Sequence, residues 1–130
     1  MMYNNIMNTI EYSFKFPIQV LSDRITIALS NLGLNEFYAA FKYLRDILKN
    51  ILEKKDDSHE SIKDSVTIVQ NKYGITFRTL INSLNKIFYK CPIDDDALKV
   101  LIAKRLNFYI KIKALKEYTI KEISKSSMYN

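Results

Sequence analysis

Two short helical patterns meet at Gly74, inside residues 66–90. Glycine suits a turn between helices because it adopts a positive φ without the steric cost of a Cβ atom. Thr76 follows as a predicted N-cap, so the second helix should run over Phe77–Lys90. This spacing is close to that of a helix-turn-helix, in which a scaffold helix supports a second helix in the major groove of DNA.

The second helix of this motif has a polar side that suits DNA recognition. The side chains on it can bond to phosphates or to base edges. Together with the capping threonine, they are Thr76, Arg78, Thr79, Asn82, Asn85 and Lys86. We expect Lys63, Lys72 and Lys90 to hold the phosphate backbone. An ordinary solvated helix face has a similar composition, and Ile81 on this side could instead meet a protein partner.

Composition places these helices in a single all-α domain. The chain has 130 residues, of which 48% are apolar, enough for one compact core. It has only two glycines and two prolines, which is typical of long helices rather than of a turn-rich sandwich. We predict a compact domain of about five to six helices over residues 17–125, between an N-terminal arm (1–16) and a short tail (126–130).

Helix-period apolar stripes mark two helices before the motif. The first covers about residues 18–31, and Gly33 should stop it. Asn35 should cap the second, whose aromatic stripe of Phe37 and Phe41 is expected to lie in the core. The core set that we expect is Leu29, Phe41, Leu44, Leu48, Val69, Leu80 and Leu84.

Two further helix starts are predicted from polar or acidic side chains. Ser61, with Asp64 three residues later, forms a capping box for the first helix of the motif. After the second helix of the motif, the acidic residues 94–96 favour a new start. Alternation at residues 110–113 is typical of a strand, but no turn follows it to make a hairpin. We therefore predict helix to about residue 124.

Positive charge is concentrated in the second half of the chain. Residues 1–60 hold seven basic and eight acidic side chains, whereas residues 61–91 hold five basic residues and one acid. Residues 92–130 add eight basic and five acidic residues, and the whole chain carries a net charge of +6. A polyanion-binding surface requires such a distribution, although the lysine-rich composition of an AT-rich coding sequence gives a similar sum.

Other function classes lack their characteristic residues. The single cysteine, Cys91, excludes an internal disulfide and a cysteine-rich zinc site, and indicates a reducing cytoplasm. His59 has no second histidine with which to share a metal, and the acidic run at 94–96 needs only the helix dipole to explain it. No apolar run approaches the roughly 18 residues that span a membrane. We therefore expect a cytoplasmic non-enzyme with no cofactor, no metal and no membrane partner.

Residues 18–93 resemble the C-terminal effector domain of the master sporulation response regulator of endospore-forming bacteria. A short helix ending near a glycine, followed by an aromatic-rich helix with Tyr43, Leu44 and Arg45, is similar to the opening helix pair of that family. Residues 66–90 are similar to its scaffold and recognition helices. The resemblance implies an all-α DNA-binding domain that pairs on tandem promoter sites, here without the family's receiver domain.

The chain departs from that family at the positions that read bases. The family's recognition helix carries several arginines, an acid and a histidine, whereas this chain has Thr79, Ile81, Asn82, Asn85 and Lys86. Asparagine could read adenine instead. We therefore expect a transcription regulator that binds double-stranded DNA as a homodimer. The alternative is an interaction protein that pairs with a full-length sporulation response regulator, or with another transcription regulator, and modulates it without reading DNA.

Overall fold

The computed structural model describes residues 18–91, 93, 95–96, 98–99 and 107–128. The helices are α2 (Ile18–Leu32), α3 (Ala39–Lys54), α4 (His59–Tyr73), α5 (Phe77–Lys90) and α7 (Phe108–Met128). No β-strand occurs among the described residues, so the predicted all-α fold class is confirmed. The predicted arm at residues 1–16 lies outside this range, and the start predicted at residues 94–96 lies partly outside it.

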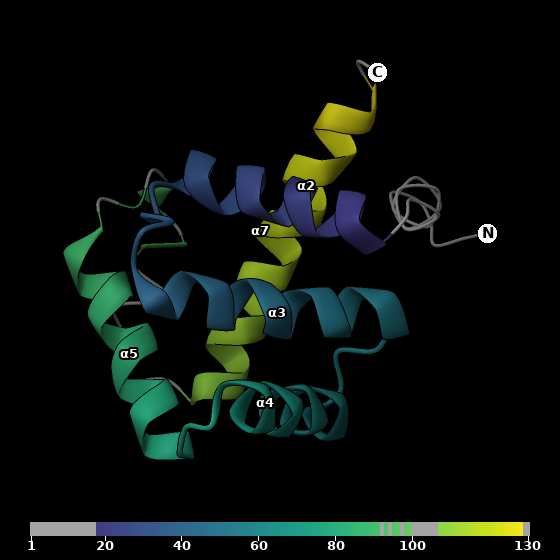
Figure 1. The fold of residues 1–130 in the computed structure, drawn as a ribbon. Helices are drawn as coiled ribbons and strands as arrows, with labels where there is room; N and C mark the ends of the chain where they lie inside the picture. The colour runs from purple at the N-terminus through teal and green to yellow at the C-terminus, as the bar shows by residue number, and fades with distance from the viewer. Residues whose placement is uncertain (1–17, 92, 94, 97, 100–106, 129–130) are drawn as a thin grey trace.

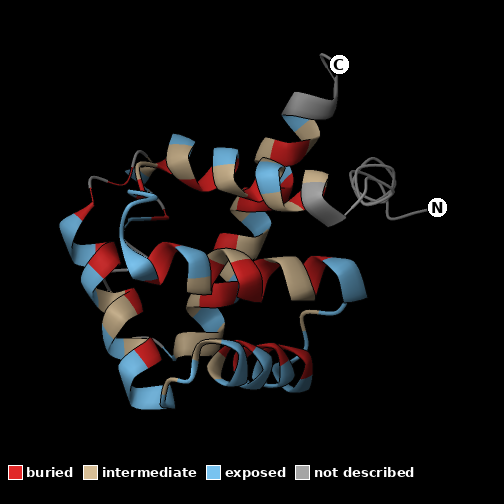
Figure 2. Ribbon diagram, in the orientation of Figure 1, coloured by how far each residue is buried: buried red, intermediate tan, exposed pale blue. Residues whose placement is uncertain are grey.

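The central helix of the fold is α3, against which every other described helix packs. It lies between α2 and α4, α5 stands across one end, and α7 crosses behind (Figure 1). Leu44, Ile47 and Leu48 of α3 have no exposed surface, and the buried sides of the other helices turn towards them (Figure 2). All seven residues of the predicted core are buried: Leu29, Phe41, Leu44, Leu48, Val69, Leu80 and Leu84.

Several helix ends follow the local signals in the sequence. Gly33 follows α2 with φ 107°, and the Leu34 N–H donates to the Leu29 carbonyl at 3.1 Å, which closes the helix as predicted. The bounds of α5 are the predicted ones. Residues 110–113 are helical and belong to α7, with Ile112 fully buried, so the prediction of helix over strand is confirmed there.

The predicted start of α3 is wrong. The Asn35 side chain accepts the Phe37 N–H at 2.8 Å, and its carbonyl accepts the Tyr38 N–H at 3.2 Å, so Asn35 stabilises a turn before the helix. The helix begins only at Ala39. Phe37 therefore stands on the turn rather than on the helical stripe and is 91% exposed, so it is not a core residue.

The predicted capping box of α4 is also wrong, because an earlier serine caps the helix. The Ser58 hydroxyl accepts the Ser61 N–H at 3.2 Å, and the Ser58 N–H itself donates to Asp56 at 3.0 Å. Ser61 is thus the third helical residue of α4, and its side chain is buried. The polar connection before α4 supplies the cap that the sequence pattern placed three residues later.

Long-range contacts hold α7 on the connection between α3 and α4. Lys116 donates to Asp57 at 2.7 Å and pairs with Glu117 at 3.0 Å. Burial alone would lower the pKa of Lys116, but its hydrogen bonds to these carboxylates outweigh burial and the pKa is raised. The ring of His59, at the start of α4, packs on Tyr109 with 4.0 Å between ring centroids. Phe108, the first residue of α7, also packs edge-on against Phe77, the first residue of α5, with 6.2 Å between ring centroids.

Candidate nucleic-acid interface

The connection between α4 and α5 consists of residues 74–76 and is hydrogen-bonded at both ends. Gly74 has φ 63°, and its N–H donates to the Gln70 carbonyl, which also accepts the Ile75 N–H at 3.1 Å. A Cβ atom at Gly74 would meet nothing within 4 Å, so the backbone conformation and not lack of space favours glycine. The Thr76 hydroxyl accepts the Thr79 N–H at 3.1 Å, which confirms the predicted cap. From this connection α5 leaves in a different direction from α4 (Figure 1).

The inner face of α5 anchors the helix on the core. Leu80 and Leu84 have no exposed surface, and Ile87 is 1% exposed. At the end of the helix, the Cys91 thiol is buried and its sulfur accepts the Asn35 N–H at 3.3 Å. The helix is therefore held by apolar packing along its length and by the turn before α3 at its C-terminal end.

The outer face of α5 presents one polar stripe. Arg78, Asn82 and Asn85 recur at intervals of three to four residues, which places them on one side of an α-helix. Arg78 and Asn82 are exposed and Asn85 is half-buried. Tyr89 continues this stripe and is 81% exposed. Tyr89 was not among the predicted contacts, although the same helical spacing would have placed it beside them.

The cations on α5 have no acidic partner within the described part of the chain. The helix contains no acidic residue. Arg78, Lys86 and Lys90 are exposed, and none of them forms an ion pair within the described part of the chain. This face therefore carries cations that are available to an anionic ligand.

Other predicted contact residues are less available. The Thr76 hydroxyl, besides capping α5, donates to the Thr79 hydroxyl at 3.0 Å. Ile81 is half-buried, so it offers less apolar surface than a fully exposed isoleucine would. Lys63 is exposed but lies ten residues before the end of α4, about 15 Å along the helix axis from the connection.

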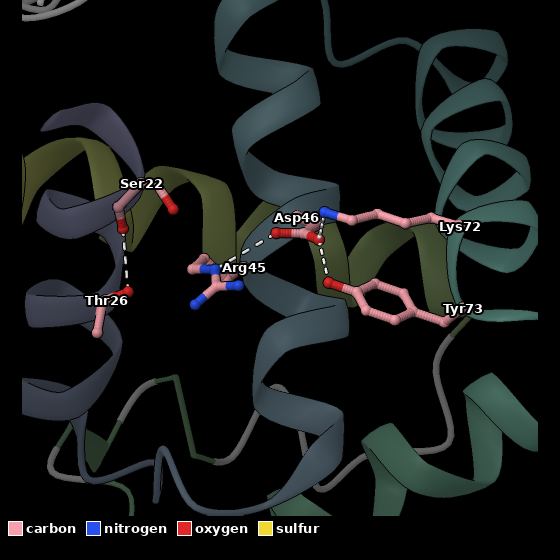
Figure 3. A network of polar contacts seen from close by, with 6 residues as sticks. All are labelled: Ser22, Thr26, Arg45, Asp46, Lys72 and Tyr73. Atoms are coloured by element: carbon pink, nitrogen blue, oxygen red, sulfur yellow. Dashed lines mark hydrogen bonds and ion pairs between the residues drawn. The ribbon is translucent and has the colours of Figure 1, made fainter. Parts of the chain in front are cut away.

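Lys72 belongs to a polar network that joins α4 to α3 (Figure 3). Its ammonium donates to the Asp46 carboxylate at 2.9 Å, and the Tyr73 hydroxyl donates to the same oxygen at 2.5 Å. Arg45 approaches the other oxygen at 3.3 Å. The Asp46 side chain is only 8% exposed, so these three donors replace the water that a surface carboxylate would have.

The network shifts the pKa values of its members. Burial alone would raise the pKa of Asp46, but hydrogen bonds from Tyr73 and Lys72 outweigh burial and the pKa is lowered. The hydrogen bond to Asp46 raises the pKa of Lys72. Burial and the same carboxylate raise the pKa of Tyr73. Lys72 therefore stays charged, and its charge is partly neutralised by Asp46.

A metal site and a membrane-spanning helix are both absent from the described residues. No group of three or more histidine, cysteine or acidic side chains in this part of the chain is arranged to hold a metal ion. No described helix combines the length and the apolarity that crossing a membrane requires.

No protein-family model, curated protein sequence or solved structure matches this chain. On α5, three exposed cations share one helix that contains no acidic residue.

Proposed function

We propose that this chain is a DNA-binding transcription regulator that inserts α5 into the major groove of double-stranded DNA. The observation that carries the proposal is the set of exposed cations Arg78, Lys86 and Lys90, which have no acidic partner among the described residues and lie on a helix whose opposite face is anchored in the core. In this arrangement Arg78 would contact guanine, and Asn82 and Asn85 would contact adenine. Lys86 and Lys90 would hold phosphates.

The protein would act without chemistry of its own, as a cytoplasmic regulator resembling the effector domain of the sporulation response regulator. A homodimer would place two copies of α5 on adjacent half-sites. The hydrogen-bonded connection at residues 74–76 supports this use of α5. It fixes the orientation of the helix, so less conformational freedom is lost when the helix binds in a groove.

A titration of a random-sequence duplex at several salt concentrations tests the proposal. With about four phosphate contacts, the log–log slope of affinity against salt should be about −3 to −4, because each neutralised phosphate releases counterions. The triple variant Arg78→Ala/Lys86→Ala/Lys90→Ala should make this slope shallower by about 2, because it removes the two lysines that hold phosphates.

A charge-matched control separates the α5 face from net charge. The triple variant Lys54→Ala/Lys113→Ala/Lys121→Ala removes three exposed lysines from α3 and α7 and should change the slope by less than about 1. Equal changes in slope for the two triple variants would show that DNA does not bind to one particular face of the protein. Absence of duplex binding at low salt would overturn the proposal and favour the alternative of a protein that pairs with a transcription regulator.

A further inference from the structure

Two aromatic side chains are far more exposed than any other large apolar residue in the described part of the chain. Phe37 is 91% exposed and Tyr89 is 81% exposed, whereas the next, Ile27, is 53% exposed. Folding leaves both rings in water, although aromatic rings are the side chains that gain most from burial. Neither ring is explained by the core.

Both rings project from the same end of the molecule. The Asn35 N–H donates to the sulfur of Cys91 at 3.3 Å, which joins the turn before α3 to the end of α5. Phe37 is two residues after Asn35, and Tyr89 is two residues before Cys91. The turn that carries Phe37 is itself fixed, because the Asn35 side chain accepts the Phe37 N–H at 2.8 Å. The backbone is therefore ordered around both rings before any ligand arrives.

The charged side chains on the helix of Tyr89 are cationic, whereas Glu36 beside Phe37 and the residues Asp95 and Asp96 after the helix are acidic. Lys86 and Lys90 lie in the last two turns of α5 with Tyr89, and no acidic residue occurs on that helix. Glu36, beside Phe37, accepts a hydrogen bond from Ser30 at 3.3 Å. A second copy of the chain docked by the same end would bring the same lysines face to face, which costs like-charge repulsion. Exposed rings beside lysines that have no acidic partner among the described residues are a combination that binds unpaired bases and their phosphates.

We propose that Phe37 and Tyr89 stack on unpaired bases, so that the chain binds a single-stranded nucleic-acid segment beside the duplex held by α5. The proposal rests on the proposed function, because the duplex occupies the rest of the α5 face. The rings accept any base, because every base has a π-face, and Lys86 and Lys90 would hold the phosphates at the point where the duplex passes into this segment. Sequence preference would then come from α5 and not from the aromatic end.

The test compares a blunt duplex with the same duplex carrying an oligo-dT overhang, either 5′ or 3′, by fluorescence anisotropy. The wild-type protein should bind one overhang duplex at least about tenfold more tightly than the blunt one. The double variant Phe37→Ala/Tyr89→Ala should bring the affinity ratio of the two duplexes close to one. The variant Phe37→Leu/Tyr89→Leu should do nearly the same, because it keeps apolar surface and removes the rings.

The controls separate the rings from general effects. Ile110→Ala removes a half-exposed apolar side chain from α7 and should leave the affinity ratio unchanged. Because Phe37 and Tyr89 are mostly exposed, the circular dichroism spectrum and the urea midpoint of each variant should match those of the wild type.

The possible failures are distinguishable. If the wild type binds the blunt duplex and both overhang duplexes equally tightly, the stacking proposal is overturned and the proposed function stands. Binding of free oligo-dT without binding of any duplex would support the stacking platform and overturn the duplex function. A third outcome would assign the rings to an interface between copies of this chain. In it, the wild type has an affinity ratio of one and self-associates in analytical ultracentrifugation, and Phe37→Ala loses that self-association.

Discussion

The outer face of α5 and the junction of α3 with α4 both carry basic side chains, but only the junction neutralises them. Lys72 has the Asp46 carboxylate at 2.9 Å, whereas Lys86 has no carboxylate partner among the described residues. The two lysines look alike in the sequence and contribute equally to a net charge. The comparison shows that the formal charge counted from a sequence is larger than the charge that is unpaired in the folded protein and available to a ligand.

The difference between the two lysines arises from the side chains that α4 and α5 direct towards α3. The last turn of α4 brings Lys72 and Tyr73 to Asp46, a buried carboxylate that needs donors. The inner face of α5 brings only apolar side chains such as Leu80 and Leu84 to the core. Polar groups on α4 are thus used partly for stability, whereas Arg78, Lys86 and Lys90 on α5 remain exposed. The predictions below test this division.

The largest expected effect comes from the inner face of α5. Leu84→Ala should lower the free energy of unfolding by about 2–5 kcal/mol, because it removes a fully buried side chain and leaves a cavity. Lys86→Ala, two residues along the same helix, should change it by less than about 0.5 kcal/mol. Urea unfolding followed by circular dichroism measures both. Similar losses in the two variants would mean that the outer face also supports the fold.

The next effect comes from the junction. Asp46→Asn should lower the free energy of unfolding at pH 7 by about 1–3 kcal/mol, because the Lys72 and Tyr73 donors lose a charged acceptor. Urea unfolding at pH 7 provides the measurement. An unchanged midpoint would show that the network adds nothing to stability beyond the apolar packing of α3 on α4.

The same variant has a defined pH dependence. The pKa of Asp46 is lower in the folded protein than its usual value of 3.8, so the folded state favours the charged carboxylate. The stability that it contributes is therefore fully present above about pH 5 and is lost as the pH falls through the lowered pKa. The difference in stability between wild type and Asp46→Asn should shrink steadily below about pH 4. A difference that stays constant down to pH 3 would contradict the lowered pKa.

Features that depend on neighbouring residues could be predicted from the sequence. The turn at Gly74, the cap at Thr76 and the bounds of α5 each follow from a few adjacent residues, and the structure has all of them. The start of α3 could not be located in the same way. Asn35 can cap a helix or stabilise a turn, and only the packing of the following residues decides which. The exposed Phe37 follows from that choice.

Burial of the apolar stripes could be predicted, but specific polar contacts between distant residues could not. Lys72 and Asp46 are 26 residues apart, and no periodicity connects them. The contact between Asn35 and Cys91, which brings Phe37 to the end of α5, spans 56 residues. Tyr89 is different, because its spacing from Arg78 and Asn82 was visible in the sequence. Its exposure, which makes it a candidate for stacking, required the structure.

The smallest expected effect compares the two lysines directly. Lys72→Met should lower the free energy of unfolding by at most about 1 kcal/mol, because its side chain is 56% exposed and such ion pairs contribute little. In the duplex titration, Lys86→Met should make the salt slope shallower by about 0.9, the value for one lost phosphate contact, and Lys72→Met should change it less. Both variants remove one charge and keep the apolar stem. Equal changes in the salt slope for Lys72→Met and Lys86→Met would show that the ion pair between Lys72 and Asp46 opens when DNA binds. Lys72 would then contact phosphate, as the sequence predicts. The difference between the α3–α4 junction and α5 would in that case hold only for the free protein.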